Sequence, residues 1–318
     1  MLSGRPEGSG AITERPGISV VLATYNHAPY IGEAISSVLG QQTSRGFELI
    51  ISEDCSTDET REIVREAAGR DSRVRLIQSS VNLRSNEVVA RGIRSAQGRY
   101  ICLLDGDDRW IVTDKLERQA ALLDSEPGAA ACFGNALIVR GTAHEPTSDL
   151  WTPGSQASAL DLAGIWRGNP FATSAGMMRR TALAELGEWY AGFFPVTDWP
   201  LYILCAAHGD LLFVDEAVAA YRLHEGGLFS ALPDREKLAK ISQFFPDMDE
   251  ATGGRWHEHA RCGHATYLLE WADQYATSGR HDLARACLWM ALRSGAVLHG
   301  SRLFTRWART TARVAVGR

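Results

Sequence analysis

Several features of other protein classes are missing from this sequence. No stretch approaches the roughly 18 uninterrupted apolar residues that a membrane-spanning helix needs. The six cysteines of the 318-residue chain form no C-x-x-C pair, which disfavours a disulfide framework and a cysteine zinc site. The net charge of -5 disfavours a general nucleic-acid binder. We therefore expect a cytoplasmic protein with reduced thiols and no nucleic-acid partner.

Three regions of the chain differ in composition. Residues 1–16 are polar and rich in Gly and Pro, without the apolar core of a signal peptide, which predicts a disordered lead. Residues 17–230 alternate between strand-like and helix-like patterns. Residues 231–318 are mostly helical in pattern, which predicts a C-terminal helical extension.

The alternating region predicts a parallel sheet wrapped by helices. Buried strands are expected at 18–23, 47–52, 74–78, 100–104 and 130–139, with helices at 31–39, 87–96 and 114–124. Ser56 and Glu59 have the spacing of a capping box, which predicts that another helix begins at Ser56. Alternating strands and helices of this kind form α/β folds, in which parallel strands are buried on both faces.

Polar residues follow three of these strands. Thr24, Tyr25 and Asn26 follow the first strand, and Asp54 follows the second. The fourth strand ends in LLDGDD. Because ligands of parallel sheets bind beyond the carboxyl ends of the strands, these positions predict one binding site.

The LLDGDD stretch places the carboxylates of Asp105, Asp107 and Asp108 within four positions. A divalent cation such as Mg²⁺ or Mn²⁺ relieves their repulsion most simply, because it takes carboxylate oxygens as ligands. One alternative is an acidic turn that is exposed to solvent and has no function. A second alternative is a haloacid-dehalogenase-like phosphatase, whose first aspartate is the nucleophile. In those enzymes, however, the motif ends the first strand, and here it ends the fourth.

Five stretches together resemble the family 2 glycosyltransferases. They are ISVVLATYNHAPYIGEAISSVLGQ, FELIISEDCSTDET, AQGRYICLLDGDD, TDWPLYILCAAHGD and YRLHEGG. Their order and spacing match that family from about residue 17 to residue 230. The resemblance implies a GT-A fold, which is a mixed, mostly parallel sheet flanked by helices. It also implies an inverting sugar transfer from a nucleotide-diphosphate donor, by default a UDP-sugar or a dTDP-sugar.

The resemblance assigns a donor-binding role to five residues. Thr24, Tyr25 and Asp54 would hold the nucleotide base. Asp107 would reach the ribose and the donor sugar. The family often carries Arg-Asn where this chain has Val89 and Ala90, and Arg84 or Arg91 would replace a lost phosphate or ribose contact.

The resemblance also assigns the metal site and the catalytic base. Asp108 would bind Mn²⁺ or Mg²⁺ directly, together with Asp107 and His224, and Arg222 would pair with phosphate. Asp198 matches the position of the base that deprotonates the acceptor hydroxyl. Each assignment has a structural alternative: Asp198 also fits a helix N-cap, His224 a structural histidine, and Arg222 a pair with a carboxylate.

The last predicted helix carries a basic face. Arg302, Arg306, Arg309 and Arg313 recur at intervals of three and four residues, and Leu303, Trp307, Thr311 and Val314 form a second face. A basic amphipathic helix is typical of peripheral contact with anionic lipid, here at the inner face of the plasma membrane. Packing on the core and contact with another protein are the alternatives.

These observations predict a metal-dependent inverting glycosyltransferase with a helical extension. Its acceptor would be a carbohydrate or a lipid-linked molecule in polysaccharide or glycoconjugate biosynthesis. The phosphatase and a non-catalytic nucleotide-sugar-binding relative are the alternatives.

Overall fold

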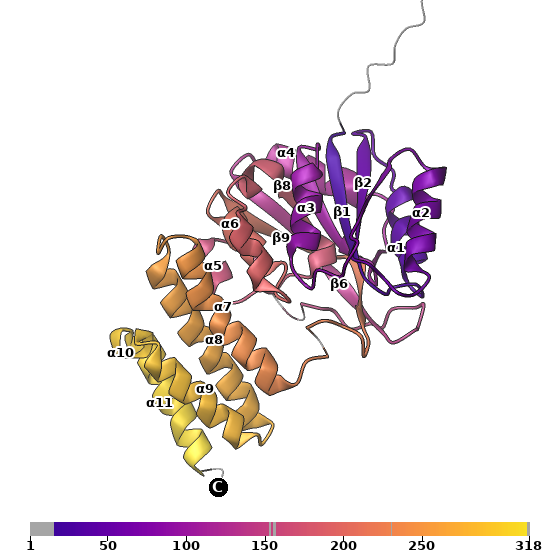
Figure 1. Cartoon of the computed structure of the whole chain (residues 1–318). Helices are drawn as coiled ribbons and strands as arrows, with labels where there is room; N and C mark the ends of the chain where they lie inside the picture. The colour runs from indigo at the N-terminus through magenta and orange to yellow at the C-terminus, as the bar shows by residue number, and fades with distance from the viewer. Residues whose placement is uncertain (1–15, 153, 155–156, 230, 317–318) are drawn as a thin grey trace, which may run out of the picture.

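The computed structural model describes residues 16–152, 154, 157–229 and 231–316. The predicted disordered lead, residues 1–16, lies outside the described residues except for its last position. A nine-stranded mixed sheet is covered by helices on both faces, and a group of C-terminal helices lies at one side of it (Figure 1). The predicted α/β class with a helical C-terminal part is confirmed.

The first half of the fold is the predicted parallel sheet. Its strands are β1 (Ile18–Thr24), β2 (Phe47–Glu53), β3 (Val74–Gln78) and β4 (Tyr100–Asp105), and its helices are α1 (Ile31–Leu39), α2 (Thr60–Arg70) and α3 (Glu87–Ser95). The strands lie in the order β3-β2-β1-β4, with every neighbouring pair parallel. Thr24 is paired with Glu53, and Ala23 with Asp105, so the register brings the polar ends of β1, β2 and β4 together.

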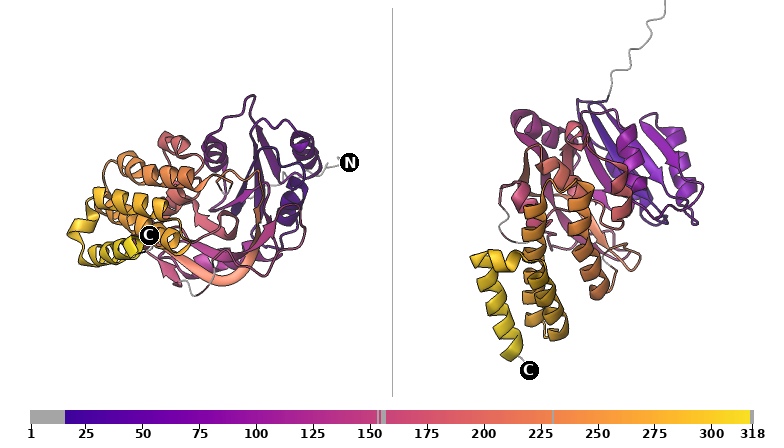
Figure 2. Two further views of the ribbon diagram at one scale, coloured as in Figure 1. Left: turned by 90° about the horizontal axis from the view of Figure 1, so that it is seen from below. Right: turned by 60° about the vertical axis from the view of Figure 1, so that its left-hand side comes forward.

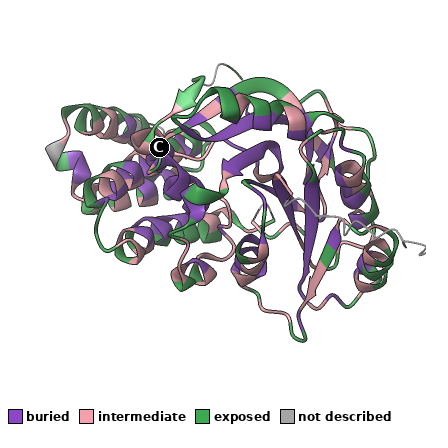
Figure 3. Cartoon of the chain, turned by 90° about the horizontal axis from the view of Figure 1, so that it is seen from above, coloured by how far each residue is buried: buried purple, intermediate pink, exposed green. Residues whose placement is uncertain are grey.

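Alternation along the strands explains why both faces of this sheet are covered. Val21, Ile50 and Leu103 belong to one hydrophobic cluster, whereas Leu22 and Leu104 belong to a second one. Successive side chains of a strand point to opposite faces, so the two clusters lie on opposite sides of the sheet. The central strands are accordingly almost wholly buried (Figure 3).

The second half of the sheet contains the antiparallel pairs. Its strands are β5 (Arg109–Trp110), β6 (Ala129–Arg140), β7 (Ala159–Leu160), β8 (Gly176–Arg179) and β9 (Asp210–Leu223), and its α-helices are α4 (Lys115–Ser125), α5 (Leu162–Arg167) and α6 (Trp199–Ala206). Three short 3₁₀ helices are η1 (Thr173–Ala175), η2 (Arg180–Leu183) and η3 (Glu188–Phe193). β8 runs antiparallel between β4 and β6. A four-residue strand has too little pattern of its own to be predicted, because its neighbours decide its pairing.

The predicted capping box at Ser56 is wrong. Helix α2 begins at Thr60, and the Ser56 hydroxyl accepts a hydrogen bond from the Asn26 N–H at 3.0 Å. The Asp58 carboxylate accepts from the backbone N–H groups of Thr60 at 3.0 Å and Ala28 at 3.1 Å. These groups join the loop after β1 to the start of α2, so a tertiary contact replaces the local cap.

The C-terminal helices are α7 (Asp234–Ala251), α8 (His257–Thr277), α9 (His281–Arg293), α10 (Ala296–His299) and α11 (Ser301–Val316). Phe244 and Phe245 of α7 share a core with Trp166 and Trp199 of the sheet region, whereas α8, α9 and α11 form a separate core. Helices α8, α9 and α11 lie beside one another (Figure 2). The proposed boundary between residues 230 and 231 falls in the link before α7. No described helix is long and apolar enough to cross a membrane.

Gly263 permits the close approach of α8 to α5. A Cβ atom at this position would lie 2.1 Å from the Trp166 carbonyl oxygen, and the backbone of α5 cannot yield as a side chain can. We expect Gly263→Ala to destabilise the protein by about 1–3 kcal/mol through overpacking, measured by denaturant unfolding.

Gly69 on α2 is the matched control for that measurement. It is also helical, and a Cβ atom there would meet nothing within 4 Å. Gly69→Ala should be neutral or stabilising by up to about 1 kcal/mol. Equal effects of the two substitutions would contradict the close packing of α8 on α5.

Acid should weaken the packing around His264. Burial lowers the pKa of His264 to about 4, and its ring stacks on Phe245 with centroids 5.0 Å apart. The unfolded chain therefore binds a proton more readily than the folded one, so stability is lost as the pH falls from about 6.5 towards 4, by up to about 3 kcal/mol. Unfolding of His264→Phe and wild type should differ in pH dependence over this range. Parallel pH profiles would contradict the prediction.

Candidate active site

A cavity of about 390 Å³ lies beyond the carboxyl ends of β1 and β4. Four carboxylates line it, three from the end of β4 and one from the start of α6: Asp105, Asp107, Asp108 and Asp198. His27 and Arg222 also line it. The structure therefore gathers residues that are up to about two hundred positions apart in the sequence at one sheet edge, as strand ends of this fold class permit.

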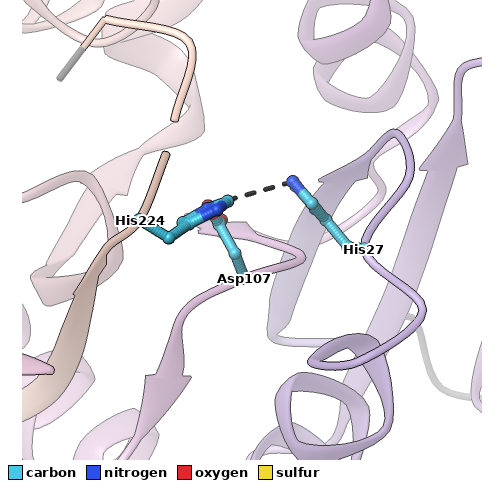
Figure 4. A group of neighbouring side chains, drawn as sticks. All are labelled: His27, Asp107 and His224. Carbon is cyan, nitrogen blue, oxygen red and sulfur yellow. Dashed lines mark hydrogen bonds and ion pairs between the residues drawn. The ribbon is translucent and has the colours of Figure 1, made fainter. Parts of the chain in front are cut away.

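Asp107 lies between two histidines. His224 Nε2 is 2.8 Å and His27 Nε2 is 3.8 Å from Asp107 Oδ2, and the three side chains point toward one another (Figure 4). Burial alone would raise the pKa of Asp107, but the charges of His27 and His224 outweigh it and lower this pKa. The Asp107 carboxylate is thus kept ionised.

His27, Asp107 and His224 can hold a divalent cation. One ligand atom from each lies within 4.8 Å of the others. Two imidazole nitrogens and one carboxylate oxygen suit Mn²⁺ better than Mg²⁺, because Mg²⁺ prefers oxygen ligands alone. Because these are three ligands, a cation that prefers six would take its remaining ligands from water or from phosphate oxygens. The donor set therefore fits a catalytic metal site.

The other two acids of the cluster are held differently. Burial and the charges of Asp107 and Asp198 raise the pKa of Asp105 to about 8. Burial and the charges of Asp107 and Asp105 raise the pKa of Asp108 well above its usual range. Protonation of these groups, or a bound cation, makes the cluster tolerable.

The predicted direct metal ligand, Asp108, lies outside the histidine group. Its carboxylate is 3% exposed, and Oδ1 accepts from the Arg222 backbone N–H at 2.8 Å. This bond turns Asp108 toward β9, whereas Asp107 faces the two histidines. Asp107 is therefore the carboxylate that faces the histidines, Asp108 also lines the cavity, and direct metal binding by Asp108 stays a prediction.

The Arg222 side chain holds the acidic loop after β4 in place through hydrogen bonds. Its Nε donates to the Asp107 carbonyl at 2.9 Å, and Nη1 donates to the carbonyls of Gly141 and Ala143. The guanidinium also lies over the Tyr30 ring, 4.5 Å from the centroid. Nη2 lies 3.4 Å from Glu33 Oε2, so Arg222 forms the pair with a carboxylate that was the structural alternative, and its phosphate contact stays a prediction.

The structure confirms the N-cap position of Asp198 and also places this residue in the lining of the cavity. It is the N-cap of α6, where Oδ1 accepts from the Trp199 N–H at 2.7 Å. Oδ2 accepts from Asn169 Nδ2 at 2.8 Å and lines the cavity. Burial raises the pKa of Asp198, which makes the carboxylate a stronger base than an exposed aspartate.

The predicted base-binding residues lie at one end of this edge. Thr24 is buried at the end of β1, and Tyr25 is half-buried beside it. The Asp54 carboxylate accepts from Ser79 Oγ and the Leu83 N–H, both at 3.0 Å, so it anchors the loop after β3. Arg84 is exposed, with a positive φ of 46°. The structure does not bring Arg84 into the cavity.

Sequence reasoning missed part of the site. His27 lies between β1 and α1, and its position two residues after Tyr25 is the one signal in the sequence that could have identified it. Asn169 and Thr173, which donate to Asp198 at 2.8 and 3.4 Å, lie in a segment without a motif. Tyr267 and Trp271 of α8 line the far side of the cavity. Only tertiary packing brings them there.

Comparison with known proteins identifies the class. The model of the family described as "Glycosyl transferase family 2" matches residues 19–187. The chain belongs to this family. This membership removes the phosphatase alternative.

Two curated relatives illustrate the range of the similarity. An uncharacterised protein of Mycobacterium tuberculosis is 30% identical over 223 residues, which cover 70% of this chain and 63% of that protein. The putative teichuronic acid biosynthesis glycosyltransferase TuaG of Bacillus subtilis is 37% identical over 128 residues, covering 40% of this chain and 49% of TuaG. The chain thus matches less than two thirds of the length of these relatives.

Solved structures confirm the GT-A fold. The S. aureus protein TarS, residues 1–349 in complex with UDP-GlcNAc, superposes with a TM-score of 0.65 at 16% identity, covering 94% of this chain and 88% of that one. The mannosyltransferase PcManGT from Pyrobaculum calidifontis, in complex with GDP-Man and Mn²⁺, gives a TM-score of 0.56 at 17% identity, covering 96% and 86%.

Metal binding tests the histidine group directly. We expect the protein to bind Mn²⁺ more tightly than Mg²⁺, and His27→Ala and His224→Ala each to weaken Mn²⁺ binding by about tenfold or more. Titration followed by the electron paramagnetic resonance signal of free Mn²⁺ measures both. His208→Ala, which changes a histidine far from the acidic loop, is the control. Loss of Mn²⁺ binding in Asp108→Asn but not in His27→Ala would show that Asp108, and not the histidine group, binds the metal.

Proposed function

We propose that the protein transfers a sugar from a UDP-sugar or dTDP-sugar to an acceptor hydroxyl, with Mn²⁺ or Mg²⁺ as cofactor. The acceptor is a carbohydrate or a lipid-linked molecule in polysaccharide or glycoconjugate biosynthesis. One observation carries this proposal: Asp198, a base-like carboxylate, lines the same cavity as Asp107 and His27, which belong to the metal-type group.

Thr24, Tyr25 and Asp54 form the nucleotide end of the proposed donor site. Tyr25 offers a ring to the base, and Asp54 offers carboxylate oxygens to an imino N–H. The names of the solved relatives support a nucleotide-sugar donor, because TarS was crystallised with UDP-GlcNAc. The diphosphate would then lie at the histidine group.

The chemistry follows from the placement of the charged groups. A cation held by His27, Asp107 and His224 would neutralise the charge that develops on the departing diphosphate. Asp198 Oδ2 would accept the proton of the acceptor hydroxyl while that oxygen attacks the anomeric carbon. Asn169 holds this carboxylate oxygen in place, so the base is positioned before the acceptor arrives.

Aromatic residues form the acceptor side of the cavity. Trp151 and Tyr221 pack against each other with ring centroids 4.4 Å apart, and Tyr267 and Trp271 with centroids 5.9 Å apart. All four line the cavity. Flat apolar rings beside the polar groups of Asp198 suit the apolar face and the hydroxyls of a sugar ring. The C-terminal helix α8 thus contributes to the proposed acceptor site.

A thermal-shift titration tests the donor. We expect UDP or dTDP to raise the melting temperature of the wild type only with Mn²⁺, whereas GDP should have less effect. Asp107→Asn should abolish the metal-dependent shift, because it removes the only charged metal ligand. If no nucleotide shifts the wild type, the proposed donor site is wrong.

Asp198→Asn tests the base separately. Asn is as good an N-cap as Asp, so the melting temperature and the nucleotide shift should persist. Turnover of the donor, with water or a sugar as acceptor, should fall by about 10²–10⁴-fold because the proton acceptor is lost.

The matched control for this variant is Asp161→Asn. Asp161 caps α5 through the Gly164 N–H at 2.7 Å and does not line the cavity. This control should keep full turnover. Unchanged turnover in Asp198→Asn would contradict the base role and would mean that Asp198 serves only as the N-cap of α6. A wild type that binds nucleotide but turns over no donor would be a non-catalytic relative.

A further inference from the structure

The apolar face of α11 is covered by the protein itself. Val314 is 3% exposed, and the Trp307 indole N–H donates to the Leu288 carbonyl of α9 at 3.0 Å. Leu303 packs against the same core. The apolar face therefore packs on the protein, as one of the alternatives for this helix expected. A lipid surface can meet only the remaining, exposed side of the helix.

The basic face of α11 lies over an open groove beside α8. Its volume is about 440 Å³, and it is lined by Asp273, Ser301, Arg302, Thr305, Arg306, Arg309, Thr310 and Arg313. Asp273 pairs with Arg306 at 3.1 Å and with Arg313 at 3.3 Å, and Glu270 lies 3.5 Å from Arg306. These two acids dock the helix onto α8.

Two arginines of the groove remain unneutralised. Arg302 and Arg309 are exposed, and within the described residues neither forms an ion pair. The acids that face α11 from α8 are Asp273 and Glu270, and both already bind Arg306. The groove therefore keeps an excess of positive charge toward solvent.

Apolar residues adjoin this charge on the exposed side of α11. Phe304 is 48% exposed and Leu298 of the preceding helix α10 is 63% exposed. Ala308, Ala312 and Ala315 are also exposed. At 100° per residue these alanines lie between Phe304 and Arg309 around the helix. A small apolar strip thus borders two free guanidinium groups.

We infer that the exposed side of α11 binds an anionic membrane surface. Arg302 and Arg309 would contact lipid phosphates, while Phe304 would enter the headgroup region. Arginine forks bind phosphate oxygens bidentately, and an aromatic ring favours the membrane interface. A small soluble anion would use the arginines alone and would not need the apolar strip. The helix lies at the edge of the molecule away from the sheet (Figure 2). No described element covers its exposed side.

Vesicle co-sedimentation of the full chain tests the inference. We expect binding to vesicles of equal parts phosphatidylcholine and phosphatidylglycerol, little binding to phosphatidylcholine alone, and weakening as salt rises above about 0.1 M. Arg302→Glu with Arg309→Glu should reduce the bound fraction by about tenfold or more. Phe304→Ser should also reduce it, although it changes no charge.

Arg65→Glu with Arg70→Glu on α2 is the matched control, since it makes the same change in net charge at the opposite end of the molecule (Figure 1). It should bind vesicles as the wild type does. The melting temperature and nucleotide response should be unchanged in all variants, which keeps this test separate from that of the active site.

Three results would overturn the inference. They are no binding of the wild type to the anionic vesicles, equal loss in the control and the α11 variants, and full displacement from vesicles by dilute inorganic pyrophosphate. The last would show a site for a soluble anion. A fourth result, binding that survives both arginine changes, would also overturn it, because the contact would then lie elsewhere.

Discussion

The concentration of carboxylates at the end of β4 is the constraint on which the rest of the site depends. Three acids in four positions cannot all be ionised in a half-buried place without compensation. The chain compensates by giving each a different partner. Asp107 faces two imidazoles, Asp108 accepts the Arg222 backbone N–H, and Asp105 remains protonatable, with its pKa raised to about 8 by burial and by its acidic neighbours.

The same compensation ties distant parts of the chain together. β9 supplies Arg222, which binds the carbonyl of Asp107 in the acidic loop, and His224, directly after β9, meets the Asp107 carboxylate. The turn after β1 supplies His27. Loss of the β4 acids would therefore loosen contacts among three strands. A site built on strand ends in this way is held by the sheet itself, which fixes geometry better than a free loop.

The C-terminal helices connect the site to the outside of the molecule. Tyr267 and Trp271 of α8 line the cavity, and Asp273 of the same helix pairs with Arg306 of α11. Its early part packs on α5 at Gly263. The proposed acceptor wall and the proposed membrane surface thus share one rigid helix. An acceptor held at a lipid surface would meet the enzyme on this side.

The sequence by itself determined the strand-helix alternation, the parallel half of the sheet and the strand ends where polar residues gather, because period and burial are local properties of a sequence. It also indicated Asp107 and Asp198, through motif and N-cap spacing. Tertiary structure decided which acid faces the histidines, since side-chain direction depends on β9. It likewise decided the short strand β8, the start of α2 and the burial of the apolar face of α11, because each depends on partners far away in the chain.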